Sequence, residues 1–382
     1  MARLSLALGF VLLFVCSAGA QSPPPSDAAI RTLVRNWLQE TDGIGISIGV
    51  YDAGQRRFFN AGVPRLDANK ASTQHTIYEI GPITRTFTGQ ILARAIVEGR
   101  ATPDDEVAKF LDEPYPNLEN GGERVRLVHL TNRTAGLADN IPDLSQLRPV
   151  PGQTTVATHM SVLGGYSRGE FLRQLHRVKP QRQPGLEPGS SNVAHMLLGV
   201  ALEKMYGEPF EAILAREIEK PLRMGSGVAP DPKRIATGHT KEGDALPPYE
   251  ARMGYASNAL RYSADDLLKF ASWQLVERDA SVKLAHKPTW TARDGRNALA
   301  YYWIVGPSPH GRRVYVTGGT YGFAGLCELY PDAQLALVLL ANKNADGAQE
   351  SLRTLSARIV ELLKPGLLTN PSSSEGAPPP DR

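Results

Sequence analysis

Cysteine is scarce in this sequence, with two residues in a chain of 382. Cys16 falls in an apolar N-terminal stretch, and Cys327 falls in the apolar run GFAGLCELY. If the N-terminal stretch is removed, a single cysteine remains, which excludes an internal disulfide in the mature chain. Because its neighbours are apolar, we expect Cys327 to be a buried thiol and not a nucleophile.

An excess of charge of one sign is also missing. The chain has 42 basic and 39 acidic residues and a net charge of +3, a balance that gives no electrostatic footprint for nucleic acid. Metal-site spacings such as His-Glu-x-x-His are likewise missing from the sequence. We therefore expect neither a nucleic-acid partner nor a metal or other cofactor.

Long apolar runs are confined to the N-terminus. The run LSLALGFVLLFVC follows Arg3, and SAGA then supplies an Ala-x-Ala cleavage pattern. This arrangement predicts a signal peptide over residues 1–20, since the run is short for a membrane span and small residues follow it directly. The protein is expected to be exported to a bacterial periplasm or beyond, with no stable membrane span after cleavage.

Proline-rich and serine-rich segments flank the part of the chain that can fold. QSPPPSD (residues 21–27) reads as a linker, and residues 369–382 read as a disordered tail, because neither has enough apolar residues to form a core. The sequence thus predicts one folded domain over residues 28–368.

The two ends of that domain have matching patterns. A helical periodicity opens it and another closes it, and strand patterns lie just inside each of them. Turns are expected at Gly318-Gly319 and at Pro331-Asp332. The pattern predicts an α/β (α+β) fold in which both termini complete one antiparallel sheet and a helical subdomain is inserted between them. Terminal helices are predicted at 30–40 and 348–363, strands at 43–54, 55–63, 312–320, 322–333 and 334–343, and inserted helices at 88–99, 191–207, 209–222 and 263–275.

Five segments, in order, resemble the serine β-lactamase and penicillin-binding-protein superfamily, specifically its class C-like hydrolase and esterase branch. They are YEIGPITRTFTGQILARAIVEGRATPDDEVAKFL, VRLVHLTNRTAGLADN, PGSSNVAHMLLGVALEKMYGEPFEAIL, ALRYSADDLLKFA and VTGGTYGFAGLCELYPDAQLALVLLANK. The resemblance covers nearly the whole predicted domain and implies a β-lactamase/transpeptidase-like fold.

The resemblance also implies acyl transfer. In the family a serine at a helix start attacks a carbonyl, a lysine one turn later helps to take its proton, and a tyrosine or serine assists. A strand carrying His-Thr-Gly or Lys-Thr-Gly lines the site. In this sequence the serine and lysine positions are Pro82 and Arg85, the Tyr-x-Asn positions are Ser190 and Asn192, and the strand positions are Val316, Thr317 and Gly318, followed by Gly319.

Four of these positions depart from the family's chemistry. Pro82 has neither a nucleophilic atom nor a backbone N–H. Arg85 stays protonated and is no general base. Ser190 is shorter than tyrosine, and Val316 removes a polar head. These departures predict a pseudoenzyme.

The helix itself is expected to persist despite those departures. Proline is tolerated in the first turn of a helix, where its missing N–H would have no partner. Ile83, Phe87, Ile91 and Ala95 follow at helical spacing and form an apolar stripe. The segment is therefore predicted to keep its packing role.

Three functions remain open at this point. The first is a binding or scaffold module, with Arg85 as a cation for an anionic peptide or a cell-wall-like ligand. The second is a divergent serine hydrolase (an esterase, amidase or β-lactamase-like enzyme) that uses Ser190, with His195 as its partner, or a bound water. The third is a structural secreted domain with an occluded pocket. A small-molecule or peptide ligand is expected under the first two.

Overall fold

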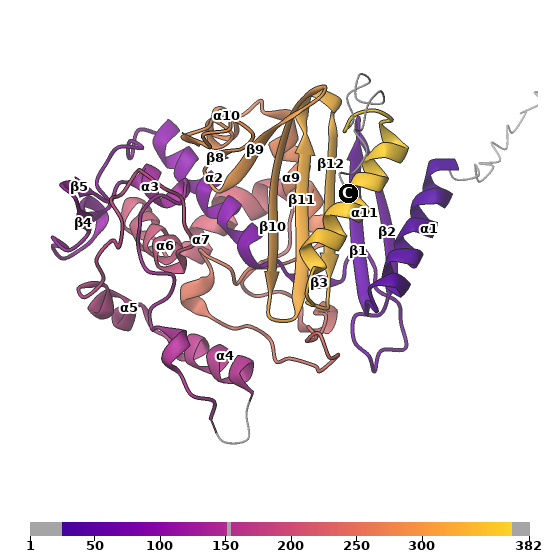
Figure 1. Ribbon diagram of the computed structural model, residues 1–382, viewed down its shortest axis with the longest axis horizontal. Helices are drawn as coiled ribbons and strands as arrows, with labels where there is room; N and C mark the ends of the chain where they lie inside the picture. Colours follow the sequence, from indigo (N-terminus) through magenta and orange to yellow (C-terminus); the bar gives the residue numbers. More distant parts are fainter. Residues whose placement is uncertain (1–24, 151–153, 369–382) are drawn as a thin grey trace, which may run out of the picture.

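Strands from both ends of the chain lie side by side in one antiparallel sheet. The computed structural model describes residues 25–150 and 154–368, so the predicted signal peptide and the predicted tail lie outside it. The eight-stranded sheet has the order β2-β1-β12-β11-β10-β9-β8-β7, and the N-terminal β1 pairs with the C-terminal β12 (Figure 1). The predicted sheet architecture is confirmed. Its strands are β1 (Gly45–Asp52), β2 (Gln55–Gly62), β7 (Trp290–Thr291), β8 (Ala298–Ala300), β9 (Trp303–Ser308), β10 (Gly311–Thr320), β11 (Phe323–Tyr330) and β12 (Leu335–Ala341).

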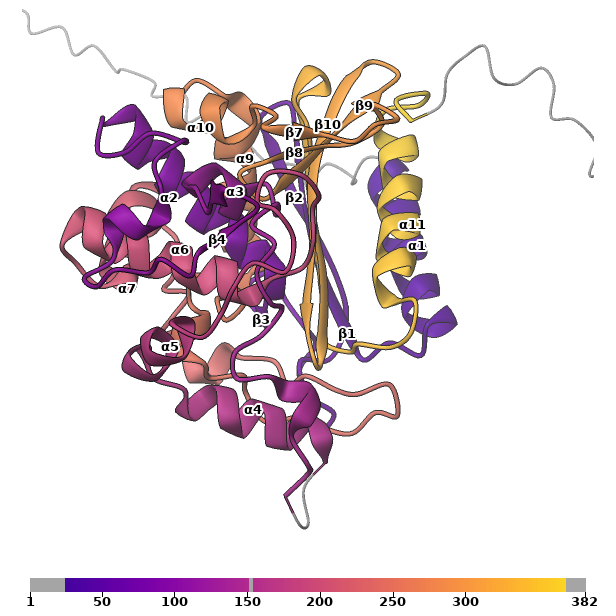
Figure 2. The same ribbon diagram turned by 60° about the vertical axis from the view of Figure 1, so that its left-hand side comes forward.

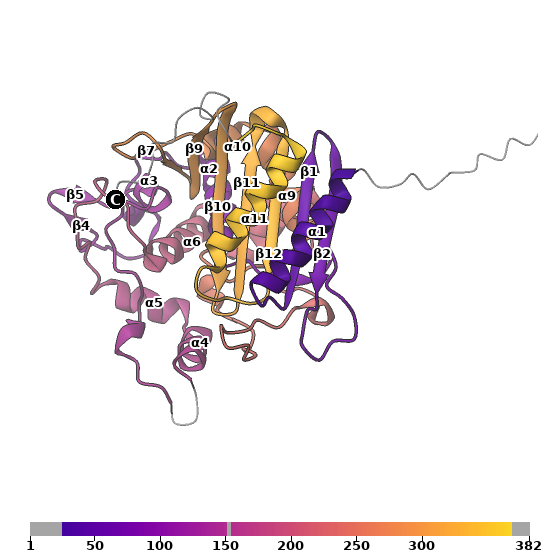
Figure 3. The same ribbon diagram turned by 45° about the vertical axis from the view of Figure 1, so that its right-hand side comes forward.

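The two terminal helices, α1 (Pro25–Glu40) and α11 (Ala348–Leu363), cover one face of this sheet (Figures 2 and 3). Ile30 and Ile359 are fully buried in the apolar cluster beneath them. Helix α1 begins within the stretch predicted as a linker, and that boundary was wrong. Proline is accepted in a first helical turn, and Asp27 is held by an ion pair of 2.9 Å with Arg57 of β2.

The opposite face carries the inserted helical subdomain. The apolar stripe of α2 is confirmed, since Ile83, Phe87 and Ile91 are fully buried. The segment predicted as one helix at 209–222 is divided by a π-helical turn at 215–219. The helices of this part are α2 (Thr84–Val97), α3 (Leu127–Thr131), α4 (Thr155–Gly165), α5 (Arg168–Leu175), α6 (Asn192–Tyr206), α7 (Phe210–Leu214), α8 (Lys220–Leu222), α9 (Ala264–Val276) and α10 (Ala280–Ala285), with the short strand pairs β3 (Ile77–Glu79) with β6 (Arg261–Ser263) and β4 (Glu119–Asn120) with β5 (Glu123–Arg124).

One predicted turn was misplaced. Gly318 and Gly319 lie inside β10, where they pair with Gly325 and Ala324 of β11, and the chain reverses just after them. The glycines are needed because Ile80 and Gly81 touch the strand here.

Cys327 is fully buried, as expected, and burial raises the pKa of its thiol. Among the described helices, none combines the length and the apolar character needed to cross a membrane.

Candidate active site

The turn that carries Pro82 lies directly on strand β10. A 3-10 turn, η1 (Gly81–Ile83), joins β3 to α2, with Pro82 in its first positions. Gly81 has φ +50°, and a Cβ built on it would lie 2.1 Å from the carbonyl oxygen of Gly319. A Cβ on Gly318 would likewise lie 2.2 Å from the carbonyl oxygen of Ile80. The two backbones therefore touch, and both glycines are required for that contact.

Arg85, one turn further along α2, faces the start of α6. Its Nη2 donates to Oδ1 of Asn192 at 2.9 Å, and its Nε donates to the carbonyl oxygen of Ser257 at 3.3 Å. Burial lowers the pKa of the Arg85 guanidinium to about 10, which still leaves it charged at neutral pH. Both bonds go to neutral oxygens, so the charge is solvated by amides.

Two asparagines link this cation to a carboxylate. Asn192 accepts from Arg85 and donates through Nδ2 to Oδ1 of Asn140 at 2.8 Å. Asn140 donates in turn to Oδ2 of Asp139 at 3.3 Å, and Ser190 Oγ donates to Oδ1 of the same carboxylate at 2.8 Å. The three bonds from Arg85 to Asp139 run from donor to acceptor in one direction, which fixes the orientation of both amides.

The structure does not join Ser190 to His195. Ser190 is exposed just before the N-cap of α6, and its hydroxyl is bonded to Asp139. His195 is buried one turn into α6, with its ring centroid 5.0 Å from that of Tyr302. Burial, with a further contribution from the charges of Arg85 and Arg133, holds the pKa of His195 well below its usual value. The partner of Ser190 is thus Asp139, which sequence reasoning missed.

The strand positions divide between the two faces of the sheet. Val316 pairs with Cys327, and both belong to the apolar core on the side of the helical subdomain. Thr317 pairs with Leu326, which is buried in the cluster beneath α1 and α11. Because neighbouring residues of a strand point to opposite faces, Thr317 points away from α2 and α6. The match of Thr317 to the family's strand motif is therefore no evidence that the family's catalytic site is present.

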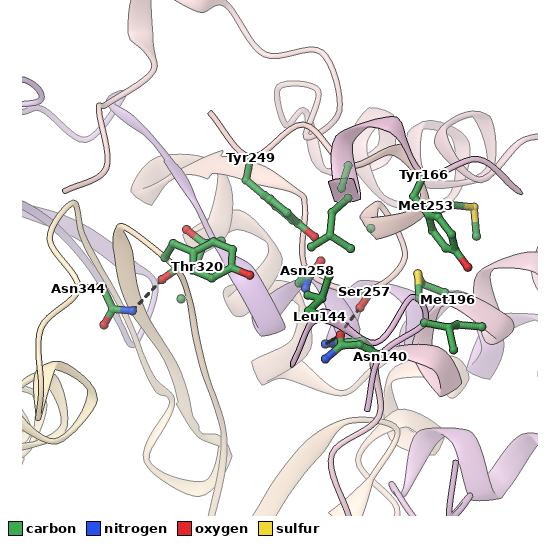
Figure 4. Close-up of a pocket in the computed structure, with 17 residues that line it drawn as sticks. Asn140, Leu144, Tyr166, Met196, Tyr249, Met253, Ser257, Asn258, Thr320 and Asn344 are labelled. Carbon is green, nitrogen blue, oxygen red and sulfur yellow. Dashed lines mark hydrogen bonds between the residues drawn. The ribbon is translucent and has the colours of Figure 1, made fainter. Parts of the chain in front are cut away.

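A cavity of about 400 Å³ opens beside α6, between the end of β10 and the loop at 249–258. Of the predicted pocket positions, only Asn192 and Gly319 line it. Pro82, Arg85, Ser190, Val316, Thr317 and Gly318 do not line it. Figure 4 shows Thr320 and Asn344 at one end of the cavity and Tyr166, Met196 and Met253 at the other.

Comparison with known proteins agrees with this architecture. The family model for beta-lactamases matches residues 30–361. The chain belongs to the beta-lactamase family. The beta-lactamase of Escherichia coli (strain K12) is 24% identical to it over 370 residues, which cover 86% of this chain and 92% of that protein.

Solved structures of beta-lactamase relatives share the fold. A beta-lactamase/D-alanine carboxypeptidase from Pseudomonas syringae superposes with a TM-score of 0.73 at 20% identity, covering 88% of this chain and 98% of that one. A mutant class C beta-lactamase gives a TM-score of 0.74 at 18% identity, covering 88% of this chain and 97% of that chain. The predicted family and the predicted β-lactamase/transpeptidase-like fold are both confirmed.

The hydroxyls in the first turn of α2 are both engaged. Thr84 and Thr86 are both fully buried. The Thr86 hydroxyl donates to the carbonyl oxygen of Ile83 at 2.8 Å, and Thr84 Oγ1 accepts from the backbone N–H of Leu260 at 3.3 Å. Among the described residues there is also no group of three or more His, Cys, Asp or Glu side chains that could hold a metal ion.

A buried acid lies behind the β10 end of the cavity. Glu79 of β3 is only 4% exposed. One carboxyl oxygen accepts from Thr320 Oγ1 at 2.5 Å and the other from the backbone N–H of Tyr249 at 2.7 Å. Burial raises the pKa of Glu79 above its usual value of 4.5, although these hydrogen bonds oppose the shift.

Replacing Glu79 by glutamine is expected to change how stability depends on pH. Because the pKa is raised in the folded state, the folded protein holds this proton more tightly than the unfolded chain does. The resulting stability is present below pH 4.5 and is lost as the pH rises through the higher folded value. Urea unfolding between about pH 4.5 and pH 8 should therefore show Glu79→Gln gaining stability relative to the wild type as the pH rises.

The matched control for this prediction is Glu242→Gln, which removes the same charge at an exposed position. Its stability should run parallel to that of the wild type over the same pH range. A parallel course for Glu79→Gln as well would contradict the prediction.

Proposed function

We propose that this chain is a beta-lactamase-family pseudoenzyme, in which the fold is kept as a binding module and acyl transfer has been lost. The supporting observation is the first turn of α2, where Pro82 stands at the serine position and the hydroxyls of Thr84 and Thr86 are buried and bonded elsewhere. Arg85, at the lysine position, donates to Asn192 and Ser257. A group that is already a protonated donor there cannot take a proton from a nucleophile.

The cavity favours a binding role over that of a purely structural domain. A volume of about 400 Å³ lies within the range typical of sites for small molecules. Two of the family-motif positions, Asn192 and Gly319, line it. The ligand is therefore expected to be a small molecule or a short peptide segment.

A second candidate is a divergent hydrolase that uses Ser190. The observation that favours it is the bond of 2.8 Å between Ser190 Oγ and Asp139 Oδ1 on the exposed side of α6. A serine beside a carboxylate has a potential proton acceptor. His195 is no part of this arrangement because it is buried against Tyr302.

Fluorophosphonate labelling followed by intact-protein mass spectrometry separates the two candidates. The protein is recovered from a periplasmic fraction and compared with Ser190→Ala, with nitrocefin and p-nitrophenyl esters as substrates. The pseudoenzyme is expected to show neither label nor turnover. A label or turnover that disappears in Ser190→Ala would establish the hydrolase and overturn the pseudoenzyme.

The same mass spectrum tests the proposed export. A protein processed by signal peptidase should begin at Gln21, after removal of residues 1–20. An unprocessed N-terminus would contradict the signal-peptide prediction and leave the result of the labelling unaffected.

A further inference from the structure

We propose that the cavity takes an uncharged ligand that presents an amide N–H to the β10 end and a flat apolar group to the Tyr166 end. The inference rests on the proposed function, since it names the ligand class of the same cleft. It departs from the expectation of an anion at Arg85, because that expectation required the guanidinium to face the ligand.

The lining of the cavity carries no charged side chain. Its seventeen described residues comprise four asparagines, a serine and a threonine, three tyrosines, two methionines, three aliphatic residues, an alanine and two glycines. A carboxylate buried among such groups would lose its hydration without gaining a counter-charge. An uncharged ligand avoids that cost.

The nearest charges lie behind neutral residues that face the cavity. The Nε and Nη2 hydrogen bonds of Arg85 end on Ser257 and Asn192, which line the cavity. Glu79 lies behind Thr320, which donates to it at 2.5 Å. Arg85 itself does not line the cavity, so its charge lies outside the surface that a ligand would contact.

Two hydroxyls, one at each end of the cavity, are left as acceptors because their hydrogens are used elsewhere. Thr320 uses its hydroxyl hydrogen on Glu79, and Tyr166 donates its own to Oε1 of Gln174 at 3.1 Å. Burial raises the pKa of Tyr166 to about 12, so it stays a neutral phenol. An acceptor repels a carboxylate and receives an amide N–H. At these two points the lining favours a neutral donor.

The remaining walls suit a flat apolar group. Tyr249 and Tyr321 meet edge to face, with ring centroids 6.4 Å apart and an interplanar angle of 72°. Met196 and Met253 gather beside Tyr166 at the end away from Thr320 (Figure 4). Methionine side chains are flexible and make favourable contacts with aromatic rings, so this end can close around a ring.

Calorimetric titration with a matched pair of probes tests the proposal. N-acetyl-L-phenylalaninamide and N-acetyl-L-phenylalanine share the ring and the acetamide, and differ in whether the far end is an amide or a carboxylate. The amide is expected to bind about tenfold more tightly, or better. Equal or tighter binding of the carboxylate, or no binding of the amide, would overturn the inference.

A charge placed in the lining should change the preference. Asn344→Lys puts an ammonium group at the β10 end of the cavity, and its ratio of amide to carboxylate affinity should fall to about one or below. Asn69→Lys adds the same charge at an exposed site outside the cavity and should leave the ratio unchanged. A ratio that moved equally in both variants would show an effect of net charge and would contradict a neutral site.

The outcome is separable from that of the proposed function. Loss of the amide preference with no label or turnover would remove the ligand class and leave the pseudoenzyme intact. Turnover with an intact amide preference would overturn the pseudoenzyme and leave the ligand class intact.

Discussion

Replacing Gly81 by alanine is expected to lower the free energy of unfolding by about 3 kcal/mol or more. Two costs combine at this position. The residue has φ +50°, a backbone conformation that residues other than glycine seldom adopt. The added Cβ would also lie 2.1 Å from the carbonyl oxygen of Gly319, and a backbone oxygen cannot swing aside as a side chain would. The turn would therefore be pushed off β10.

Gly99→Ala separates these two costs. Gly99 follows α2 and has φ +73°, and a Cβ added to it would meet nothing within 4 Å. Only the backbone cost applies there, so we expect a loss of about 1 kcal/mol. Unfolding of both variants in guanidinium chloride measures the difference between their losses in the free energy of unfolding. Equal losses would mean that the turn does not depend on touching β10.

The contact between the turn and β10 also shapes the cavity. Gly319 and Thr320 line it, and they follow directly on Gly318, which touches Ile80. Displacement of the turn would move these two residues with the strand. For this reason Gly81→Ala should also weaken binding of the amide probe, whereas Gly99→Ala should not.

Much of the fold could be predicted because its signals are local and periodic. The stripe of α2 repeats every three or four residues, and each predicted member of it is buried. The start of α9 was indicated by Ser263, whose hydroxyl does accept from the backbone N–H of Asp266. Apolar strands at both ends of the chain indicated a shared sheet, which β1 and β12 form.

The site was predicted less well because its contacts are long-range. Asp139 and Asn140 are partners of Ser190 and Asn192 across separations of 51 and 52 residues, and no periodicity links a loop to a helix start. The Gly318-Gly319 pair was interpreted as a turn because paired glycines often form one. In the structure they serve a close approach of two backbones, a use that depends on a segment more than two hundred residues away.

The departures from the family chemistry are compatible with its packing. Pro82 suits a first helical turn, and Val316 adds an apolar side chain to the core on the helical side. Arg85 keeps a hydrogen bond to Asn192 that ties α2 to α6. Each of these residues makes a contact within or between elements, and the sequence matches the family model over residues 30–361.

Phe87→Ala should be among the most destabilising substitutions in the chain, with a loss of about 3–5 kcal/mol in the free energy of unfolding. Phe87 is fully buried, and its ring stacks on Phe270 of α9 at a centroid distance of 3.9 Å and on Tyr262 of β6 at 5.1 Å. Truncation leaves a cavity among rigid rings that cannot collapse into it.

Val97→Ala is the control for this prediction. Val97 ends the same helix and is 51% exposed, so its truncation should change stability by about 0.5 kcal/mol or less. Chemical unfolding monitored by circular dichroism compares the two variants. A loss in Phe87→Ala no larger than that in Val97→Ala would mean that α2 is not held by its packing. Packing could then no longer explain why this helix forms with Pro82 and Arg85 at its start.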